Sequence, residues 1–238
     1  MRVNPNDPNV ALLEIVAERL GDSLRDELVF VGGAIVGLLA TDPGAPSIRT
    51  TNDVDLICKA VVRADFHRVE GELRKLGFVH DVSPQAPICR WRVSSVAVDV
   101  MPTLKNILGF SNPWYPLALD TATRVALPSG REIRLITAPV FLATKLVAFD
   151  GRGNGDYLSS HDLGDLIAVV DGRSELLKEC RQSPEELRAY LSRRLSGILA
   201  TPSFQDALPG HLPTDSASQE RLPYLQARLR EIAAIISE

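Results

Sequence analysis

The stretch that decides the fold runs from residue 29 to residue 57 and begins at Val29 with V-F-V-G-G-A-I-V-G-L-L-A. Its first apolar run ends in Gly32 and Gly33, and a helical pattern begins directly after the glycine pair. A second apolar run at 53–57, D-V-D-L-I, carries two carboxylates separated by one residue. The pattern predicts a buried strand, a helix that starts at the glycines, and a second strand.

The same reading of periodicity extends to the rest of the chain. Strands and helices alternate up to residue 136, and the pattern from residue 137 onward is helical. We therefore expect an α/β core over residues 1–136, followed by a C-terminal helical domain over residues 137–238. The strands are expected at 28–31, 54–58, 88–93, 96–101, 124–127 and 132–136. The helices are expected at 10–20, 34–40, 65–76, 137–149, 161–170, about 183–199 and about 221–236.

Capping, turn and stop signals mark the ends of these elements. Gly21 is expected to end the first helix, and Ser94-Ser95 is expected to turn a hairpin between the strands at 88–93 and 96–101. The remaining signals are an N-cap at Asp7, an N-cap at Ser160, a capping box at 183–186, a glycine-rich loop at 151–155 and a proline-rich connection at 201–213.

Composition restricts the class of protein. The chain has 238 residues, of which 45% are hydrophobic and 24% charged, as in an ordinary globular protein. No apolar run approaches the roughly 20 residues that span a bilayer, and the N-terminal residues lack the apolar stretch of a signal peptide, so we expect a cytoplasmic protein. The three cysteines Cys58, Cys89 and Cys180 are odd in number and widely spaced, which favours free thiols. The net charge of −4 argues against sequence-blind coating of nucleic acid but allows a local basic groove.

Three carboxylates lie on the predicted strands. Asp53 and Asp55 project from the same face of their strand because successive side chains alternate. Asp99, in V-A-V-D-V-M, lies opposite the buried positions on a predicted neighbouring strand and can face that pair. Hard divalent cations prefer such oxygen ligands and usually take one or two carboxylates together with phosphate oxygens. The pattern therefore indicates a site for a metal-bound nucleoside triphosphate, with Asp99 as the general base or a ligand of a second metal.

The glycine pair supplies the other half of this predicted site. Glycine allows a ligand to approach the backbone closely, and a following helix offers free N–H groups, so Gly32 and Gly33 fit a phosphate cradle. The pattern is neither a Walker motif nor a G-x-G-x-x-G fingerprint. Taken singly, the glycine pair is also compatible with a tight turn, and the two aspartates with a surface acidic pair. The order and spacing of all the parts favour the site.

Residues 32–38, G-G-x-x-x-G-L, residues 49–56, R-x-T-x-D-x-D-L, and the later Asp99 together resemble the nucleotidyltransferase superfamily of the polymerase-β type. The resemblance implies an α+β fold in which a small mixed nucleotidyltransferase sheet is flanked by helices and followed by a C-terminal helical region. It also implies an enzyme that transfers a nucleoside monophosphate from ATP or another NTP to an acceptor hydroxyl.

The helical half resembles one subgroup of this superfamily. K-L-V-A at 145–148, Arg152 and D-L-G-D-L at 162–166 are similar to the K-L-x-A … R … D-x-x-D-L segment of the AbiEii-like toxin nucleotidyltransferases, including the MenT group. This subgroup resemblance implies a toxin-like enzyme that acts on RNA, foremost the tRNA 3′ end, and is paired with a cognate antitoxin.

Carried over to matching positions, the resemblance implies roles for single residues. Gly32 and Gly33 would hold the triphosphate. The metal ligands would be Asp53, Asp55 and Asp99, with Mg²⁺ or Mn²⁺ as the cofactor. Lys145 would reach the phosphates as a point charge, and Asp162 would be a further active-site acid that orients Lys145 or the base. Arg49 would contact phosphate or brace the aspartate loop, and Arg152 would bind nucleotide or acceptor, whereas Asp165 is expected to be structural.

The acceptor stays open between two classes. An RNA acceptor needs a basic surface for its phosphates. The C-terminal helices offer Arg181, Arg188, Arg193, Arg194, Arg221, Arg228 and Arg230, but glutamates are interleaved among them, which is also typical of a solvated mixed-charge face. The alternative is a small-molecule enzyme similar to aminoglycoside or lincosamide nucleotidyltransferases. Trp114 and Tyr115 either stack on one of these acceptors or are simply partly buried aromatics, so they do not decide between the two.

A third hypothesis is a non-catalytic nucleotide-binding module on the same fold. The three carboxylates argue against this hypothesis, because clustered acids that bind nothing repel one another and cost stability. Metal-dependent nucleotide turnover by the purified protein distinguishes an enzyme from such a module.

Overall fold

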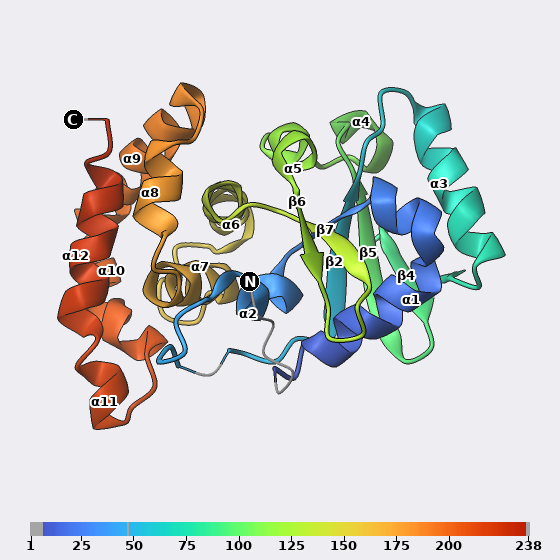
Figure 1. The fold of residues 1–238 in the computed structure, drawn as a ribbon. Coiled ribbons are helices and arrows are strands. Elements are labelled where there is room, and N and C mark those ends of the chain that lie inside the picture. The colour runs from blue at the N-terminus through green and yellow to red at the C-terminus, as the bar shows by residue number, and fades with distance from the viewer. Residues whose placement is uncertain (1–6, 47, 237–238) are drawn as a thin grey trace. The chain divides into compact units, whose positions relative to one another are not determined.

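The computed structural model describes residues 7–46 and 48–236 (Figure 1). The contacts divide the chain into two compact units. The sheet unit comprises Met1–Leu38 and Arg49–Thr137, and the helical unit comprises Leu39–Ile48 and Ala138–Glu238. The segment Leu39–Ile48 therefore groups with the helical unit, although sequence analysis places it in the α/β core.

Within the described residues, the sheet unit forms one seven-stranded sheet in the order β3-β4-β5-β2-β1-β7-β6 (Figure 1). The pairs β2–β5 and β1–β7 are parallel, and the other neighbours are antiparallel. A mixed sheet with helices packed on it confirms the predicted fold class. The strands are β1 (Val29–Val31), β2 (Asp53–Cys58), β3 (Val79–His80), β4 (Arg90–Val93), β5 (Val96–Pro102), β6 (Thr123–Ala126) and β7 (Glu132–Leu135).

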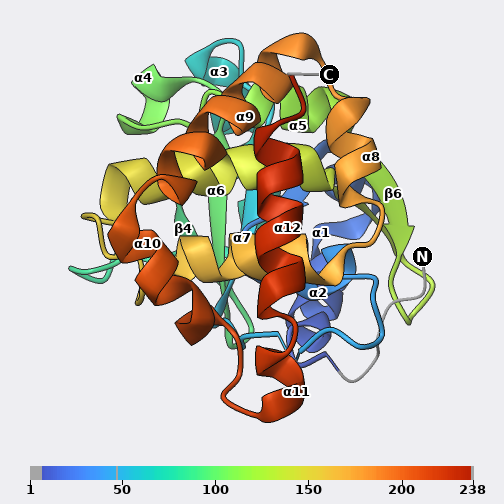
Figure 2. The same ribbon diagram turned by 90° about the vertical axis from the view of Figure 1, so that its left-hand side faces the viewer.

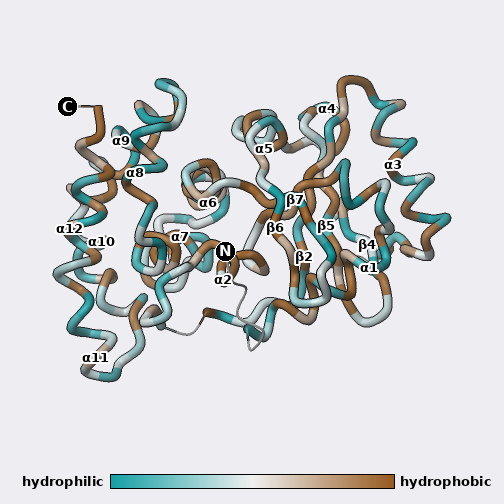
Figure 3. Tube along the Cα trace, in the orientation of Figure 1, coloured by the Kyte–Doolittle hydropathy of each residue, from teal (hydrophilic) through white to brown (hydrophobic). Residues whose placement is uncertain are grey.

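Helices cover the sheet because their apolar faces need burial. Helix α1 packs on β2, β5 and β7 through a buried stripe that includes Leu13, Val16 and Leu20. Figure 3 shows apolar and polar residues alternating along α3, which buries Phe66 and Val69 and exposes its charged positions. The helices of this unit are α1 (Val10–Glu27), the 3₁₀ turn η1 (Gly33–Ile35), α2 (Val36–Leu39, whose last residue groups with the helical unit), α3 (Arg63–Lys75), α4 (Lys105–Leu108) and α5 (Tyr115–Thr121).

Three predictions about the N-terminal elements are wrong. Helix α1 does not end at Gly21, where the backbone turns aside (φ 64°, ψ −180°), but resumes beyond it because Leu24 continues the buried stripe. Asp7 does not cap α1: the N-cap residue is Asn9, whose backbone N–H donates to Asp7 Oδ1 at 2.9 Å. The helix expected at 34–40 is a 3₁₀ turn followed by a single α-helical turn.

The helical unit is built around four helices in mutual contact (Figure 2). Helices α6 and α12 each pack on both α7 and α9, and the side chains between them, such as Phe141, Leu191 and Leu229, are fully buried. The helices are α6 (Ala138–Arg152), α7 (His161–Gly172), α8 (Leu176–Arg181), α9 (Glu185–Leu199), α10 (Pro202–Ala207), the 3₁₀ turn η2 (Leu208–His211), α11 (Ser216–Gln219) and α12 (Leu222–Ala233). Among the residues described, no helix has the length and apolar character that crossing a bilayer requires.

The local signals in the helical unit are confirmed in part. Ser160 caps α7 by accepting a hydrogen bond from Leu163 N. The capping box at 183–186 is absent, because Pro184 occupies the N-cap of α9 and has no side-chain donor or acceptor. The proline-rich connection at 201–213 contains α10 and η2, since proline is tolerated in a first helical turn and Phe204 supplies a buried anchor.

The segment 39–48 is held by hydrogen bonds within the helical unit. Thr41 N and Asp42 N both donate to Gly172 O, at 2.7 and 2.8 Å. Arg221 binds Asp42 at 2.8 Å with Nη2 and the buried Asp171 at 2.8 Å with Nε. Arg173 Nη1 donates to Leu39 O at 2.8 Å. The end of α7 and the start of α12 therefore fix a segment that is distant from both in the sequence.

Candidate functional site

The three predicted metal ligands lie together on one face of the sheet. In the parallel pair β2–β5, Asp55 is directly in register with Asp99. Asp53 lies two residues before Asp55, so strand alternation places it on the same face. The intervening Val54 and Val98 are fully buried on the opposite face. The sequence prediction that Asp99 faces the aspartate pair agrees with this register.

A residue that sequence analysis missed, Arg90, binds two of these carboxylates. Its Nε donates to Asp99 Oδ1 at 2.8 Å, and its Nη2 donates to Asp99 Oδ2 at 2.8 Å and to Asp53 Oδ2 at 2.7 Å. The bidentate geometry with Asp99 is the strong form of an arginine–carboxylate pair. The two carboxylates raise the pKa of the Arg90 guanidinium above its ordinary value, so it stays charged.

The signal that would have found Arg90 is the hairpin register. A two-residue turn at Ser94-Ser95 pairs Val93 with Val96, and counting back along both strands places Arg90 opposite Asp99, as the structure shows. Residues opposite each other on antiparallel strands point to the same face. The predicted hairpin therefore already implied an arginine beside the candidate base.

Gly32 follows β1 and lies against Asp55. Its backbone (φ 74°, ψ −162°) is a conformation that residues with a side chain rarely adopt. A Cβ atom built on Gly32 would lie 1.7 Å from Asp55 Oδ2. The glycine pair is therefore a turn, as its simplest interpretation holds, and its first residue places backbone close against a predicted metal ligand.

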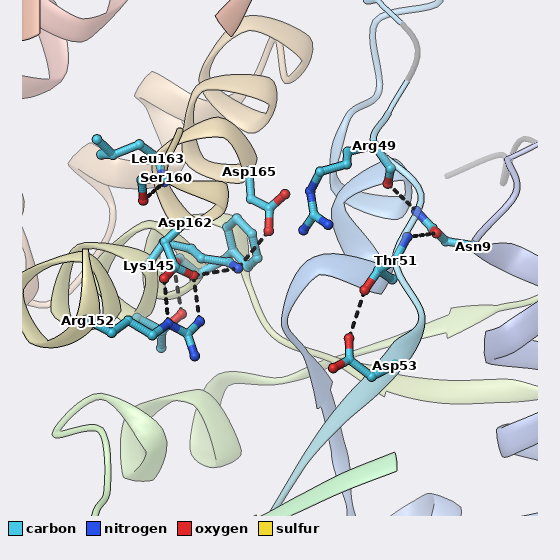
Figure 4. Close-up of polar contacts among 12 residues, drawn as sticks. Asn9, Arg49, Thr51, Asp53, Lys145, Arg152, Ser160, Asp162, Leu163 and Asp165 are labelled. Carbon is cyan, nitrogen blue, oxygen red and sulfur yellow. Dashed lines mark hydrogen bonds and ion pairs between the residues drawn. The ribbon is translucent and has the colours of Figure 1, made fainter. Parts of the chain in front are cut away.

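Asn9 fixes the approach to β2, as Figure 4 shows. This fully buried side chain donates from Nδ2 to Arg49 O and accepts from Thr51 N with Oδ1, both at 3.0 Å. Thr51 Oγ1 then donates to Asp53 Oδ1 at 2.8 Å. The backbone of Arg49 is held by this chain of contacts, while its side chain is exposed and its Nη1 donates to Thr50 O at 3.3 Å.

A second cluster of predicted site residues lies in the helical unit (Figure 4). Lys145 Nζ contacts Asp165 Oδ2 at 2.7 Å and Asp162 Oδ1 at 3.1 Å. Arg152 grips Asp162 with Nε and Nη2, both at 2.8 Å. Helix α6 runs on to Arg152, so this arginine lies on the helix rather than in the loop predicted at 151–155, where a turn follows instead.

Burial and charge determine the electrostatics of both clusters. Burial alone would raise the pKa of Asp162, but Arg152 and Lys145 together hold it below its ordinary value. The pKa of the Cys89 thiol is raised to about 12, chiefly by burial and further by the carboxylates of Asp99 and Asp55. Cys89 is therefore a thiol near the carboxylates rather than a thiolate ligand.

The carboxylates fit a divalent cation by their chemistry. Asp53, Asp55 and Asp99 offer hard oxygen donors on one face of the sheet, and Arg90 binds two of these three carboxylates. Among the described residues, however, no group of three or more His, Cys, Asp and Glu side chains has metal-site spacing. The carboxylates are of the right chemical type for a divalent cation, but Arg90 binds both Asp99 and Asp53 on this face.

The seven arginines expected to form an RNA surface differ in burial and in the partners they bind. Arg194 pairs with Asp150, Arg221 binds Asp171 and Asp42, and the buried Arg228 donates to backbone carbonyls. Of the seven arginines, three are exposed: Arg181, Arg193 and Arg230. The two aromatic candidates, Trp114 and Tyr115, are buried in the sheet unit.

Comparison with protein-family models gives no match, and comparison with curated proteins gives none. Among solved structures, the chain is similar to "ANT(2″)-Ia in complex with adenylyl-2″-tobramycin", at 13% identity and a TM-score of 0.44, covering 79% of this chain and 97% of that one. It is also similar to a "putative nucleotidyltransferase from H. pylori", at 11% identity and a TM-score of 0.47, covering 98% and 97%. Likenesses at this level assign neither a family nor an activity to the chain.

Proposed function

We propose that this protein is a metal-dependent nucleotidyltransferase that transfers a nucleoside monophosphate from an NTP to an acceptor hydroxyl. The observation that carries the proposal is the register of Asp55 with Asp99 on parallel strands. Asp53 lies on the same face, and the half-buried backbone of Gly32 lies against Asp55. Three carboxylates beside a glycine turn suit a site for metal-bound phosphates.

The residues of the chain divide the work. Asp53, Asp55 and Asp99 would hold Mg²⁺ or Mn²⁺, which when bound neutralises phosphate charge and activates a hydroxyl. Asp99 is the general base that accepts the proton of the acceptor hydroxyl. Gly32 and Gly33 are the proposed triphosphate cradle at the end of β1, where Gly32 is half-buried and Gly33 is buried.

Lys145 and Arg152 are the proposed phosphate-binding cations. Lys145 is held between Asp162 and Asp165, which fixes its ammonium in one position and lowers the entropy cost of using it. Arg152 pairs with Asp162 while most of its side chain stays exposed to solvent, where a phosphate could reach it. Asp162 is thus proposed as the acid that orients both cations, and Asp165 as a second support for Lys145. The role proposed for Asp165, holding Lys145 in position, thus goes beyond the purely structural role expected from the sequence.

For the acceptor we propose RNA, with the tRNA 3′ end first, on the exposed Arg181, Arg193 and Arg230 of the helical unit. A small-molecule hydroxyl, as in antibiotic-modifying enzymes, is the alternative outcome of the same assay. The three cysteines are free thiols, which supports the proposed cytoplasmic location, where an antitoxin would also be found.

The test incubates the full chain with each of the four α-labelled NTPs, Mg²⁺ and total bacterial RNA. The proposal expects label in a tRNA-sized band with the wild type and none with Asp53→Ala or Asp55→Ala. Asp26→Ala is the matched control, because the exposed Asp26 pairs with Arg124 of β6, at the edge of the sheet. Labelled small molecules without labelled RNA would select the alternative acceptor. Full turnover in both Asp53→Ala and Asp55→Ala would refute the site.

A further inference from the structure

Every carboxylate oxygen of Asp53 and Asp99 already has a donor from the protein. Arg90 donates hydrogen bonds to both oxygens of Asp99 and to Oδ2 of Asp53, and Thr51 donates to Oδ1 of Asp53. The side chain of Asp99 is 10% exposed, that of Arg90 is 23% exposed and that of Asp53 is 33% exposed, so this cluster is partly shielded from water. A cation that uses these oxygens must therefore share them with Arg90 or displace it.

The two effects of Arg90 on such a cation oppose each other. An ionised carboxylate has about four acceptor positions, so one donor for each oxygen leaves acceptor capacity for a ligand. The guanidinium also fixes the two carboxylates in one orientation, which favours binding. Its positive charge, however, repels a divalent cation at close range, and this repulsion is stronger at a partly buried site than in bulk water. Since charge acts directly on the cation and orientation only on its ligands, we expect repulsion to dominate.

A triphosphate changes this balance. Its negative charges would offset the guanidinium, so the same Arg90 that weakens binding of a free cation would tolerate a cation that arrives with nucleotide. Arg92, two residues along β4, lies on the same face but pairs with Asp81, so its charge is already compensated. Arg90 therefore differs from Arg92 in that its partners are the proposed metal ligands themselves.

Resting on the proposed function, we propose that Arg90 is a positioning residue that couples metal binding to nucleotide binding. It holds Asp99 and Asp53 in place, keeps their affinity for a free divalent cation low, and lets the site load when metal and triphosphate bind together. A purely structural role of Arg90, as a strand-to-strand ion pair, predicts the opposite change on its removal, because looser carboxylates would bind the cation less well.

The test measures Mn²⁺ binding to the full chain by titration calorimetry, with and without a non-hydrolysable NTP analogue. In the absence of nucleotide, Arg90→Gln is expected to bind Mn²⁺ about tenfold more tightly than the wild type, because one opposing charge is removed. The enhancement of Mn²⁺ affinity by the analogue should shrink by a similar factor. The control Arg92→Gln should behave as the wild type. Unchanged or weaker Mn²⁺ binding by Arg90→Gln overturns the inference.

Arg90→Lys separates charge from geometry and guards against misfolding of the glutamine variant. It keeps the positive charge but loses the fork, so wild-type Mn²⁺ affinity is expected, and tightening equal to that of Arg90→Gln would overturn the charge argument. If the wild type binds Mn²⁺ and Arg90→Gln binds it equally, the role of Arg90 fails and the nucleotidyltransferase proposal stands. If neither the wild type nor the variants bind Mn²⁺ with or without the analogue, both proposals fail.

Discussion

Replacing Gly32 by alanine tests the close approach between the glycine turn and the carboxylates. The added Cβ would lie 1.7 Å from Asp55 Oδ2, 2.5 Å from its Cγ and 2.7 Å from its Cβ. No side-chain rotation of Asp55 removes the last contact, because its Cβ is fixed to the backbone of β2. The sheet or the turn must therefore move, and the aspartate moves with it.

The cost has two parts. Forcing a residue with a side chain into the backbone conformation of Gly32 costs roughly 1–3 kcal/mol. Overpacking against Asp55 adds about 1–3 kcal/mol. Gly21 is the matched control, because its backbone (φ 64°, ψ −180°) is close to that of Gly32 (φ 74°, ψ −162°) and no atom lies within 4 Å of an added Cβ. Gly21→Ala should therefore show backbone strain alone, and Gly32→Ala should lower the free energy of unfolding by about 2 kcal/mol more.

Urea unfolding followed by tryptophan fluorescence suits this comparison. Both tryptophans of the chain, Trp91 and Trp114, are buried in the sheet unit, so their signal reports on that unit. Repeating the comparison in an Asp55→Gly background removes the three clashing atoms, and only the backbone cost of Gly32→Ala should remain. Equal costs for Gly32→Ala and Gly21→Ala would refute the clash, and an excess that survives in Asp55→Gly would show that Asp55 does not cause it.

Two further predictions concern titration. Because the pKa of Asp162 is held below its ordinary value near 3.8, its contribution to stability is present above that value and is lost as the pH falls. Circular dichroism of urea unfolding between about pH 5 and about pH 2 should show this loss in the wild type and a smaller one in Asp162→Asn, and identical pH profiles would contradict the assignment. Burial raises the pKa of all three cysteine thiols, Cys58, Cys89 and Cys180, to about 12. None of them should react with a disulfide reagent in the folded protein at neutral pH, whereas all three should react in denaturant. Rapid reaction of any one thiol in the folded protein would contradict its burial.

The sequence predicted those features that depend on neighbours along the chain. Strand alternation placed Asp53 and Asp55 on one face, and the turn at Ser94-Ser95 set the hairpin that carries Asp99. Both signals are local, because the period of a strand and the geometry of a two-residue turn need no knowledge of distant residues. The same local rules would have predicted that Arg90 lies opposite Asp99. The bond from Arg90 to Asp53 was not predictable in this way, because it depends on which strand lies beside β5.

Features that depend on distant residues were not predictable in this way. Asn9 reaches Arg49 and Thr51 across some forty residues of chain, and nothing in the first helical pattern marks it as the support of β2. Gly21 carries the usual signal of a helix end, but burial of Leu24 outweighs it. Tertiary packing thus overrides local propensity where a single glycine is set against a continuous apolar stripe.

The segment between the glycine turn and β2 is hydrogen-bonded to Gly172, Arg173 and Arg221, so the sheet unit cannot be cut from the helical unit without breaking these bonds. A fragment that stops at residue 137 would keep this segment but lose every one of those hydrogen-bond partners. The segment also joins the glycine turn to the strand of Asp53, so its release would loosen both halves of the candidate site along the chain itself. Recombination that paired this sheet with a foreign helical unit would succeed only if the foreign unit brought partners for residues 39–48. The two units are therefore expected to be inherited together rather than exchanged as separate modules.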